Sequence, residues 1–104
     1  MTKSERPGPE TRRGQILHVA TRLAIKYNYK NITRAQIANK IKVTETLISY
    51  YFNTMENLRR AIIQNAIEND ILEIIAQGLA VHDPEVMKLP KEKKEKALKI
   101  LLKL

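Results

Sequence analysis

The sequence has no cysteine at any of its 104 positions. Disulfide scaffolds, thiolate metal sites and cysteine nucleophiles are therefore excluded. Histidine is almost as rare, and His18 and His82 each lack further ligands at the spacings that zinc sites require. No glycine-rich phosphate loop and no pairing of a nucleophile with a base is visible. We therefore expect a protein that is not an enzyme and that carries no metal and no cofactor.

Tryptophan is also absent, and the chain has only one phenylalanine, three glycines and four prolines. The core must then be built from Ile, Leu, Ala and some Tyr, a composition that favours helices over sheets. Uninterrupted apolar runs do not exceed three residues, which is far too short for a membrane-spanning helix. Residues 1–9 are polar and lack the apolar segment of a secretion signal. The sequence therefore predicts a cytoplasmic, all-α protein.

Positive charge is what the chain has in excess, with a formal net charge of +8. A balance of this size indicates a polyanionic partner, either nucleic acid or an acidic membrane surface, although it also keeps a protein in solution. A chain of 104 residues buries only a modest fraction of its surface. Dimerisation would therefore add to its stability.

The N-terminal half becomes helical after a polar start. Residues 1–9 end in Pro7-Gly8-Pro9 and predict a flexible basic arm. From Glu10 onward, apolar residues recur at steps of three and four as far as Tyr27, which predicts one helix with an apolar stripe. Asn28 follows, and asparagine readily takes the left-handed conformation that ends a helix.

Two short helices are predicted next. Thr33 and Gln36 form a Thr-x-x-Gln capping box at the start of the first of them. Lys42 and Val43 form a turn, and Thr44 can cap the second helix, which ends near Phe52. Two short helices separated by about three residues have the spacing of a helix-turn-helix motif.

Residues 55–104 are predicted to form a helical dimerisation region. One long helix is expected over residues 55–81, with a bend at Gly78, and a shorter amphipathic basic helix toward the C-terminus. Apolar residues make up more than half of residues 58–81, which is more than a single core-facing stripe needs, so we expect a second subunit to cover them. The predicted dimerisation residues are Ile63, Ile67, Ile71, Ile74, Ile75, Leu79, Leu98 and Leu101.

Several short motifs follow one another in a register that is typical of one family. They are Ile16-Leu17-His18-Val19-Ala20, Asn28-Tyr29, Ile32-Thr33, Ile37-Ala38, Val43-Thr44, Tyr50-Tyr51-Phe52 and Thr54-Met55-Glu56-Asn57-Leu58. In this order and spacing, the stretch from about Arg12 to Leu58 resembles the DNA-binding domain of TetR-type transcriptional regulators. The family's turn glycine is Lys42 here, its recognition-helix tyrosine is Ser49, and its phosphate-binding lysine is Met55.

The resemblance implies an all-α fold with a three-helix helix-turn-helix head over residues 10–54. The long helix and the short C-terminal helix used for dimerisation would follow the head. TetR-type regulators usually carry a large helical domain that holds a small effector. Only 46 residues follow Leu58 here, so we expect no small-molecule effector and no pocket for one.

If the helix after Thr44 lies in the major groove, its outward residues near the N-terminus reach base edges. Glu45 can accept a hydrogen bond from a cytosine amino group, or it can simply stabilise the helix dipole. Threonine hydroxyls can donate to phosphates, and basic side chains add affinity through counterion release. The predicted DNA-binding residues are Arg12, Arg13, Thr33, Arg34, Lys42, Thr44, Glu45, Thr46, Ser49, Tyr50 and Thr54.

These features together predict a sequence-specific regulator that binds double-stranded DNA at a pseudo-palindromic operator. A homodimeric repressor encoded by a bacterium, phage or plasmid, with no membrane partner, is the favoured form. One alternative is a phage or plasmid DNA-binding assembly factor for packaging, partition or nucleoid structure, which would use the same head. Another is a membrane or protein adaptor that merely retains the fold. DNA affinity at low salt and sequence preference distinguish the three hypotheses.

Overall fold

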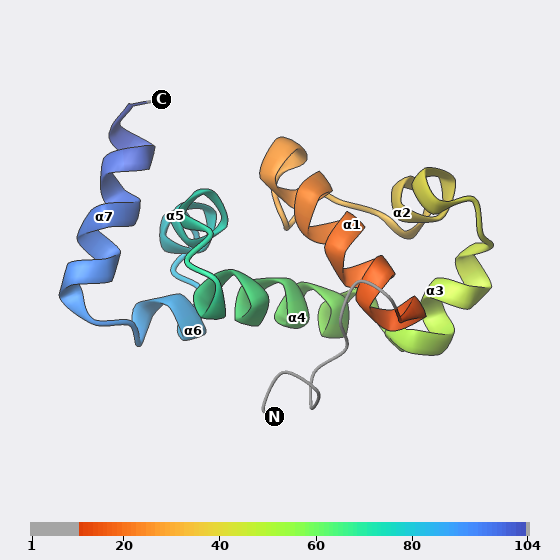
Figure 1. The fold of residues 1–104 in the computed structure, drawn as a ribbon. Helices are drawn as coiled ribbons and strands as arrows, with labels where there is room; N and C mark the ends of the chain where they lie inside the picture. The colour runs from red at the N-terminus through yellow and green to blue at the C-terminus, as the bar shows by residue number, and fades with distance from the viewer. Residues whose placement is uncertain (1–10, 104) are drawn as a thin grey trace.

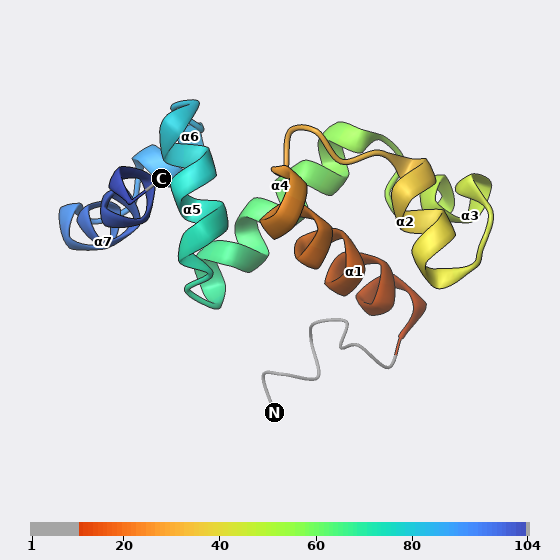
Figure 2. The same ribbon diagram turned by 90° about the horizontal axis from the view of Figure 1, so that it is seen from above.

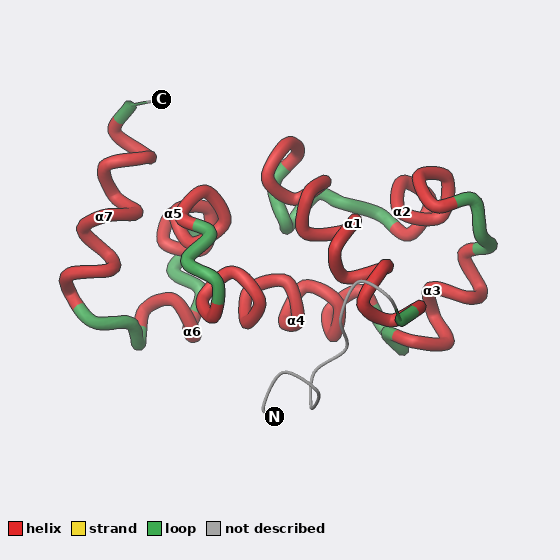
Figure 3. Tube along the Cα trace, viewed as in Figure 1, coloured by secondary structure: helices red, strands yellow, loops and turns green. Residues whose placement is uncertain are grey.

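The computed structural model describes residues 11–103, and this part of the chain is helical without any strand (Figure 1, Figure 3). The all-α prediction is therefore confirmed for it. The predicted arm of residues 1–9 and the terminal Leu104 lie outside the described residues. The helices are α1 (Arg12–Tyr27), α2 (Arg34–Ile41), α3 (Glu45–Tyr51), α4 (Met55–Glu68), α5 (Leu72–Ala80), α6 (Pro84–Met87) and α7 (Lys91–Leu102).

Helix α4 connects the two ends of the molecule (Figure 1, Figure 2). At one end α1 packs against α4 and α2, and α2 packs against α3. At the other end α5 packs against α4, α6 and α7. Helices α3 and α7 lie at opposite ends in both views. The head therefore contacts the C-terminal helices through α4, through α1 against α5, and through the loop that follows α1.

Threonine caps begin the helices of the head. A threonine hydroxyl that accepts a backbone N–H at the first turn satisfies one donor that has no partner inside the helix, which is typically worth about 1 kcal/mol. The capping box predicted at α2 is complete, because the Gln36 side chain also accepts the backbone N–H of Thr33. The capped amides are Gly14 by Thr11, Gln36 by Thr33, Leu47 by Thr44 and Asn57 by Thr54.

The prediction of a single helix over residues 55–81 is wrong. The chain forms α4 and α5 with a break at residues 69–71, and it does not bend at Gly78. Asp70 takes the left-handed conformation with φ of 53°, and the N–H of Ile71 donates to the carbonyl of Ala66 at 2.9 Å. This is the usual way in which a helix ends, and Asn and Asp tolerate the left-handed region better than most residues.

Gly78 lies inside α5 and is a point of close packing. A Cβ atom at this position would meet Cγ2 of Val86 at 2.6 Å and Cδ1 of Ile63 at 3.3 Å. The glycine therefore allows α6 and α4 to approach α5, and its role is not to bend the helix.

The break changes what covers the apolar residues of α4 and α5. Because the chain reverses direction, α5 packs between α4 and α7, and the side chains of Ile63, Ile74 and Ile75 are completely buried inside one chain. They have no surface to offer to a second copy, which corrects their prediction as dimerisation residues. Of the other predicted dimerisation residues, Leu98 is exposed, and the half-buried ones are Ile67, Ile71, Leu79 and Leu101.

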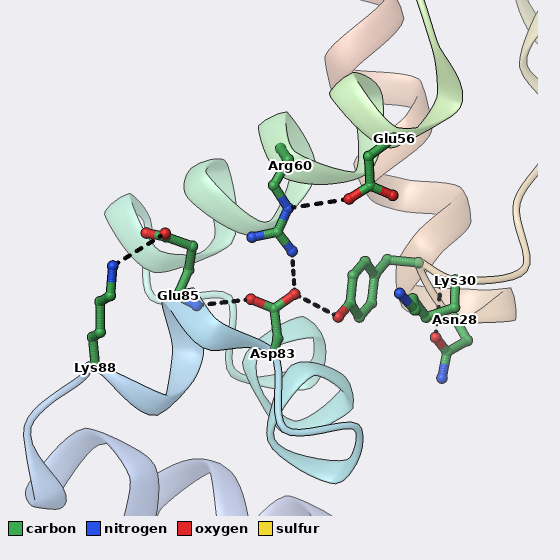
Figure 4. A network of polar contacts seen from close by, with 8 residues as sticks. Asn28, Lys30, Glu56, Arg60, Asp83, Glu85 and Lys88 are labelled. Atoms are coloured by element: carbon green, nitrogen blue, oxygen red, sulfur yellow. Dashed lines mark hydrogen bonds and ion pairs between the residues drawn. The ribbon is translucent and has the colours of Figure 1, made fainter.

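A buried carboxylate joins the head to the C-terminal helices (Figure 4). The hydroxyl of Tyr29, in the loop after α1, donates to Oδ2 of Asp83 at 2.9 Å, and Arg60 of α4 donates to the same oxygen. The backbone N–H of Glu85 donates to Oδ1 at 2.9 Å. Burial disfavours the ionised carboxyl group, but these donors outweigh it, so the pKa of Asp83 lies below its usual value. Burial and the bond to Asp83 raise the pKa of Tyr29.

A second set of polar contacts joins α1 to α5 and α4. The side chain of Gln77 accepts the backbone N–H of Tyr29 at 2.9 Å and donates to the carbonyl of Ala24 at 2.8 Å. The amide of Asn65 donates to the hydroxyl of Thr21 at 3.1 Å. The two bonds of Gln77 satisfy backbone groups at the C-terminal end of α1 and fix how α1 sits on α5, and the bond of Asn65 joins α1 to α4.

We predict that Asp83→Asn destabilises the fold in a pH-dependent way. The pKa of Asp83 is lower in the folded chain than the value of about 3.9 expected in the unfolded chain, so its ionised form stabilises the fold above that pH. This contribution is lost as the pH falls through the folded pKa. Urea unfolding at pH 7 should give a free energy lower than wild type by about 1–3 kcal/mol. The difference should shrink at pH 3.

Asp70→Asn is the matched control. The pKa of Asp70 is also lowered, by its hydrogen bond from Lys93, but this pair is exposed to solvent and should contribute little to stability. A loss for Asp83→Asn that is equal at pH 7 and pH 3, or no larger than that of Asp70→Asn, would contradict this assignment.

Candidate nucleic-acid interface

The turn between α2 and α3 has helix-turn-helix geometry. Lys42 follows α2 in the left-handed conformation, with φ of 59° and ψ of 51°. The N–H groups of Lys42 and Val43 both donate to the carbonyl of Ala38, which closes the turn. Thr44 then caps α3. A side chain in the left-handed region typically costs about 1–2 kcal/mol, so lysine makes this turn with some backbone strain.

Helix α3 is held by one apolar face and leaves the other free. Ile48 is completely buried, and Phe52 is buried directly after the helix. The guanidinium group of Arg13 lies 4.5 Å from the centre of the Phe52 ring, so the start of α1 also contacts this end of α3. On the free face, Tyr50 is 79% exposed, and its ring meets that of Tyr51 edge-on at 5.0 Å.

Most of the predicted DNA-binding residues lie at the surface of the head. Arg13, Arg34 and Ser49 are half-buried. Exposed members lie on α3, on its preceding turn, or at the N-terminal ends of α1, α2 and α4, and they are Arg12, Thr33, Lys42, Thr44, Glu45, Thr46, Tyr50 and Thr54.

Positive side chains lie at the N-terminal ends of α1 and α2, where the helix dipole disfavours positive charge in the protein without DNA. The first turns of α1 and α2 contain no acidic residue, although the N-terminus of a helix favours negative charge. They carry cations instead: Arg12 and Arg13 begin α1, and Arg34 begins α2. Nε of Arg34 is buried without a hydrogen-bond partner among the described residues. An anion beside these ends would relieve the repulsion, as phosphate groups do at helix N-termini.

The capping threonines retain a free function. In each of Thr33, Thr44 and Thr54 the hydroxyl oxygen accepts a backbone N–H, which leaves the O–H group able to donate to a phosphate oxygen. Met55 takes the position of the family's phosphate-binding lysine, and it is half-buried against the core. It supplies no charge, so the cations of this surface come from other positions.

Two features are absent from residues 11–103. They contain no cluster of three or more side chains that could hold a metal ion. None of their helices has the length and apolar character needed to cross a membrane.

The sequence did not predict the residues that hold the head against the C-terminal helices. Asp83 and Tyr29 are 54 positions apart, and Gln77 and Tyr29 are 48 apart. Their partners depend on the break between α4 and α5, which the apolar pattern did not reveal.

We predict that Lys42→Gly stabilises the protein by about 0.5–1 kcal/mol, because glycine takes the left-handed conformation without the Cβ penalty. Lys42→Ala serves as the control, since it also removes the charge and the long side chain but keeps the strained Cβ atom. It should give no such gain. Urea unfolding of the three proteins measures the difference, and equal stabilisation by both substitutions would show that the conformation of residue 42 is not the cause.

A family comparison agrees with this geometry. The model of the bacterial regulatory proteins of the tetR family matches residues 16–62, which extend from within α1 through α2 and α3 into α4. Comparisons with curated proteins and with solved structures gave no match. The matched segment contains the capped turn, the exposed face of α3 and the first half of α4. Residues 16–62 are therefore a helix-turn-helix DNA-binding domain of the tetR family of bacterial regulatory proteins.

Proposed function

We propose that this protein is a homodimeric repressor that binds a pseudo-palindromic operator in double-stranded DNA and does not respond to a small-molecule effector. Its tetR-type domain belongs to a family of DNA-binding transcription regulators. The observation that carries the proposal is the free outer face of α3, since Ile48 holds the helix from inside while Glu45, Thr46 and Tyr50 remain exposed.

These side chains suit a role in the major groove. The carboxylate of Glu45 accepts hydrogen bonds, and the cytosine amino group is the donor that a carboxylate recognises there. Thr46 and Ser49 can donate or accept, and the threonine methyl group can contact the methyl group of thymine. The cations and the threonine hydroxyls at the helix ends would hold the phosphates and set the orientation of α3.

Repression follows from occupancy, because a head bound at a promoter blocks access to it. A two-fold dimer reads two half-sites in opposite orientations, which is why the operator should be pseudo-palindromic. Independence from an effector is supported by the filled interior of the C-terminal helices, since the hollow of about 340 Å³ among α5, α6 and α7 lies open at the surface. Ile74, Ile75, Val86 and Ala97 are completely buried against their neighbours.

We predict that Arg34→Ala weakens binding to every duplex to a similar extent. The slope of the logarithm of the binding constant against the logarithm of the salt concentration should become shallower by about one unit. Arg34 begins α2 beside the Thr33 cap, where it would neutralise one phosphate. Fluorescence anisotropy with a labelled duplex at several salt concentrations measures the slope.

Arg22→Ala is the matched control for net charge. Arg22 is exposed on α1 and lies outside the helix ends discussed above. The Arg22→Ala variant should leave the salt dependence of the affinity close to that of wild type. If both variants changed the slope equally, Arg34 would act only through the general charge of the protein and not through a phosphate contact.

We predict that Glu45→Ala changes the preferred sequence with little effect on affinity for unrelated DNA. A lost base contact should reduce discrimination at one base pair by about 1–3 kcal/mol. The measured quantity is the ratio of affinities for the preferred duplex and for duplexes altered at single base pairs. Ser49→Ala should act in the same way at another position. An equal loss on all duplexes would mean that Glu45 supports the start of α3 and does not read bases.

A further inference from the structure

Tyr29, in the loop after α1, is held by the C-terminal helices at two separate points. Its backbone N–H donates to the side chain of Gln77 of α5 at 2.9 Å. Its hydroxyl donates to Oδ2 of Asp83, directly before α6, at 2.9 Å (Figure 4). Both Tyr29 and Asp83 are buried. Two bonds to different parts of one residue fix an orientation of the head and not only a distance.

The apolar contacts of α4 restrict the head less. Helix α4 packs against both α1 and α5, and its buried side chains are Leu58, Ile62, Ile63 and Ala66. Apolar attraction has no preferred direction, and packed helices can slide past each other in small shear movements. A hydrogen bond weakens steeply when its donor and acceptor are no longer aligned. The bonds of Tyr29 to Gln77 and Asp83 therefore oppose movements that the apolar contacts would allow.

A small rotation of the head has a large effect on the position of α3. The longest dimension of the molecule is 38 Å. Over half of this length, a tilt of about 10° moves α3 by about 3 Å, which is close to the step of about 3.4 Å from one base pair to the next. Two heads that move in this way would no longer fit half-sites at the original separation.

We propose that the junction formed by Tyr29, Gln77 and Asp83 determines which spacing between two half-sites the protein accepts. The proposal rests on the dimeric regulator proposed above. Tyr29 and Asp83 are buried and Gln77 is half-buried, so these are positioning residues that act through the placement of α3 and not by touching DNA. The two heads of a dimer are related by its two-fold axis. A head that is fixed on its own C-terminal helices therefore has one separation from the other head.

Duplexes with two half-sites and a spacer changed by one base pair test the proposal. Wild type should prefer one spacing by about 10-fold or more, because a shifted head loses base contacts. Tyr29→Phe removes the hydroxyl, and Gln77→Met removes both amide bonds. Each variant should reduce this preference by about 3- to 10-fold, the change that one hydrogen bond typically gives. Affinity for a duplex with a single half-site should not change, whereas partial unfolding of the head would lower it.

Thr21→Val is the matched control. The hydroxyl of Thr21 is also buried, and it accepts from the amide of Asn65 of α4 at 3.1 Å and donates to the carbonyl of Leu17 at 2.7 Å. Its removal should lower the stability of the fold, as the loss of a buried hydrogen bond generally does. The bonds of Tyr29 stay in place in this variant. Its preference for one spacing should therefore equal that of wild type.

A distance measured without DNA tests the junction independently. The chain has no cysteine, so Asn39→Cys on α2 and Lys96→Cys on α7, both at exposed positions, can carry two spin labels. An excess of unlabelled chains ensures that the two labels of one chain are measured. Double electron–electron resonance should give a narrow distance distribution for wild type and for Thr21→Val. The distribution should be broader when Tyr29→Phe or Gln77→Met is added.

An unchanged spacing preference in both junction variants would overturn the proposal, as would an equal loss of preference in Thr21→Val. Failure of the proposed function gives a different result. If wild type prefers one spacing and the junction variants keep it, the role of the junction alone is refuted. A wild type that binds no inverted repeat would refute the dimeric regulator and the spacing together, and a broadened distance would then still assign the placement of the head to the junction.

Discussion

Asp83 carries the charge around which the two ends of the molecule are joined. A carboxylate taken out of water must be surrounded by donors, since the cost of burying it unpaired is several kcal/mol. Here the donors come from three separate segments: Tyr29 from the loop after α1, Arg60 from α4, and a backbone N–H of α6. These segments have to meet for the charge to be stable. The position of the head relative to α5 and α6 follows from that requirement, and Gln77 reinforces it.

The sequence was informative where structure depends on residues within a few positions of each other. The caps at Thr33 and Thr44 and the end of α1 at Asn28 were all predicted, because each depends on a side chain and a backbone group at most four residues away. The same local rules applied to Asn69 and Asp70 would have indicated the break between α4 and α5. Apolar residues continue on both sides of that break, and this periodicity favoured a single helix.

The missed break explains the error about the dimer surface. Apolar residues around most of a helix require several neighbours, but those neighbours can belong to the same chain once it reverses direction. Ile63 of α4 and Ile74 and Ile75 of α5 are covered in this way by neighbouring helices of the same chain. Long-range partners of this kind, like Tyr29 and Asp83, cannot be read from a single sequence. The exposed face of α3 was predicted more successfully, because the alternation of Ile48 inside and Tyr50 outside is a property of one helix.

Selection of bound duplexes from a random library, at near-physiological salt, measures whether the free face of α3 reads the sequence of double-stranded DNA. We predict enrichment of an inverted repeat, with half-sites a whole number of helical turns apart, about 34–36 Å for one turn. An unenriched pool, with binding that falls steeply as salt rises, would contradict it. Affinity would then reside in the phosphate contacts alone.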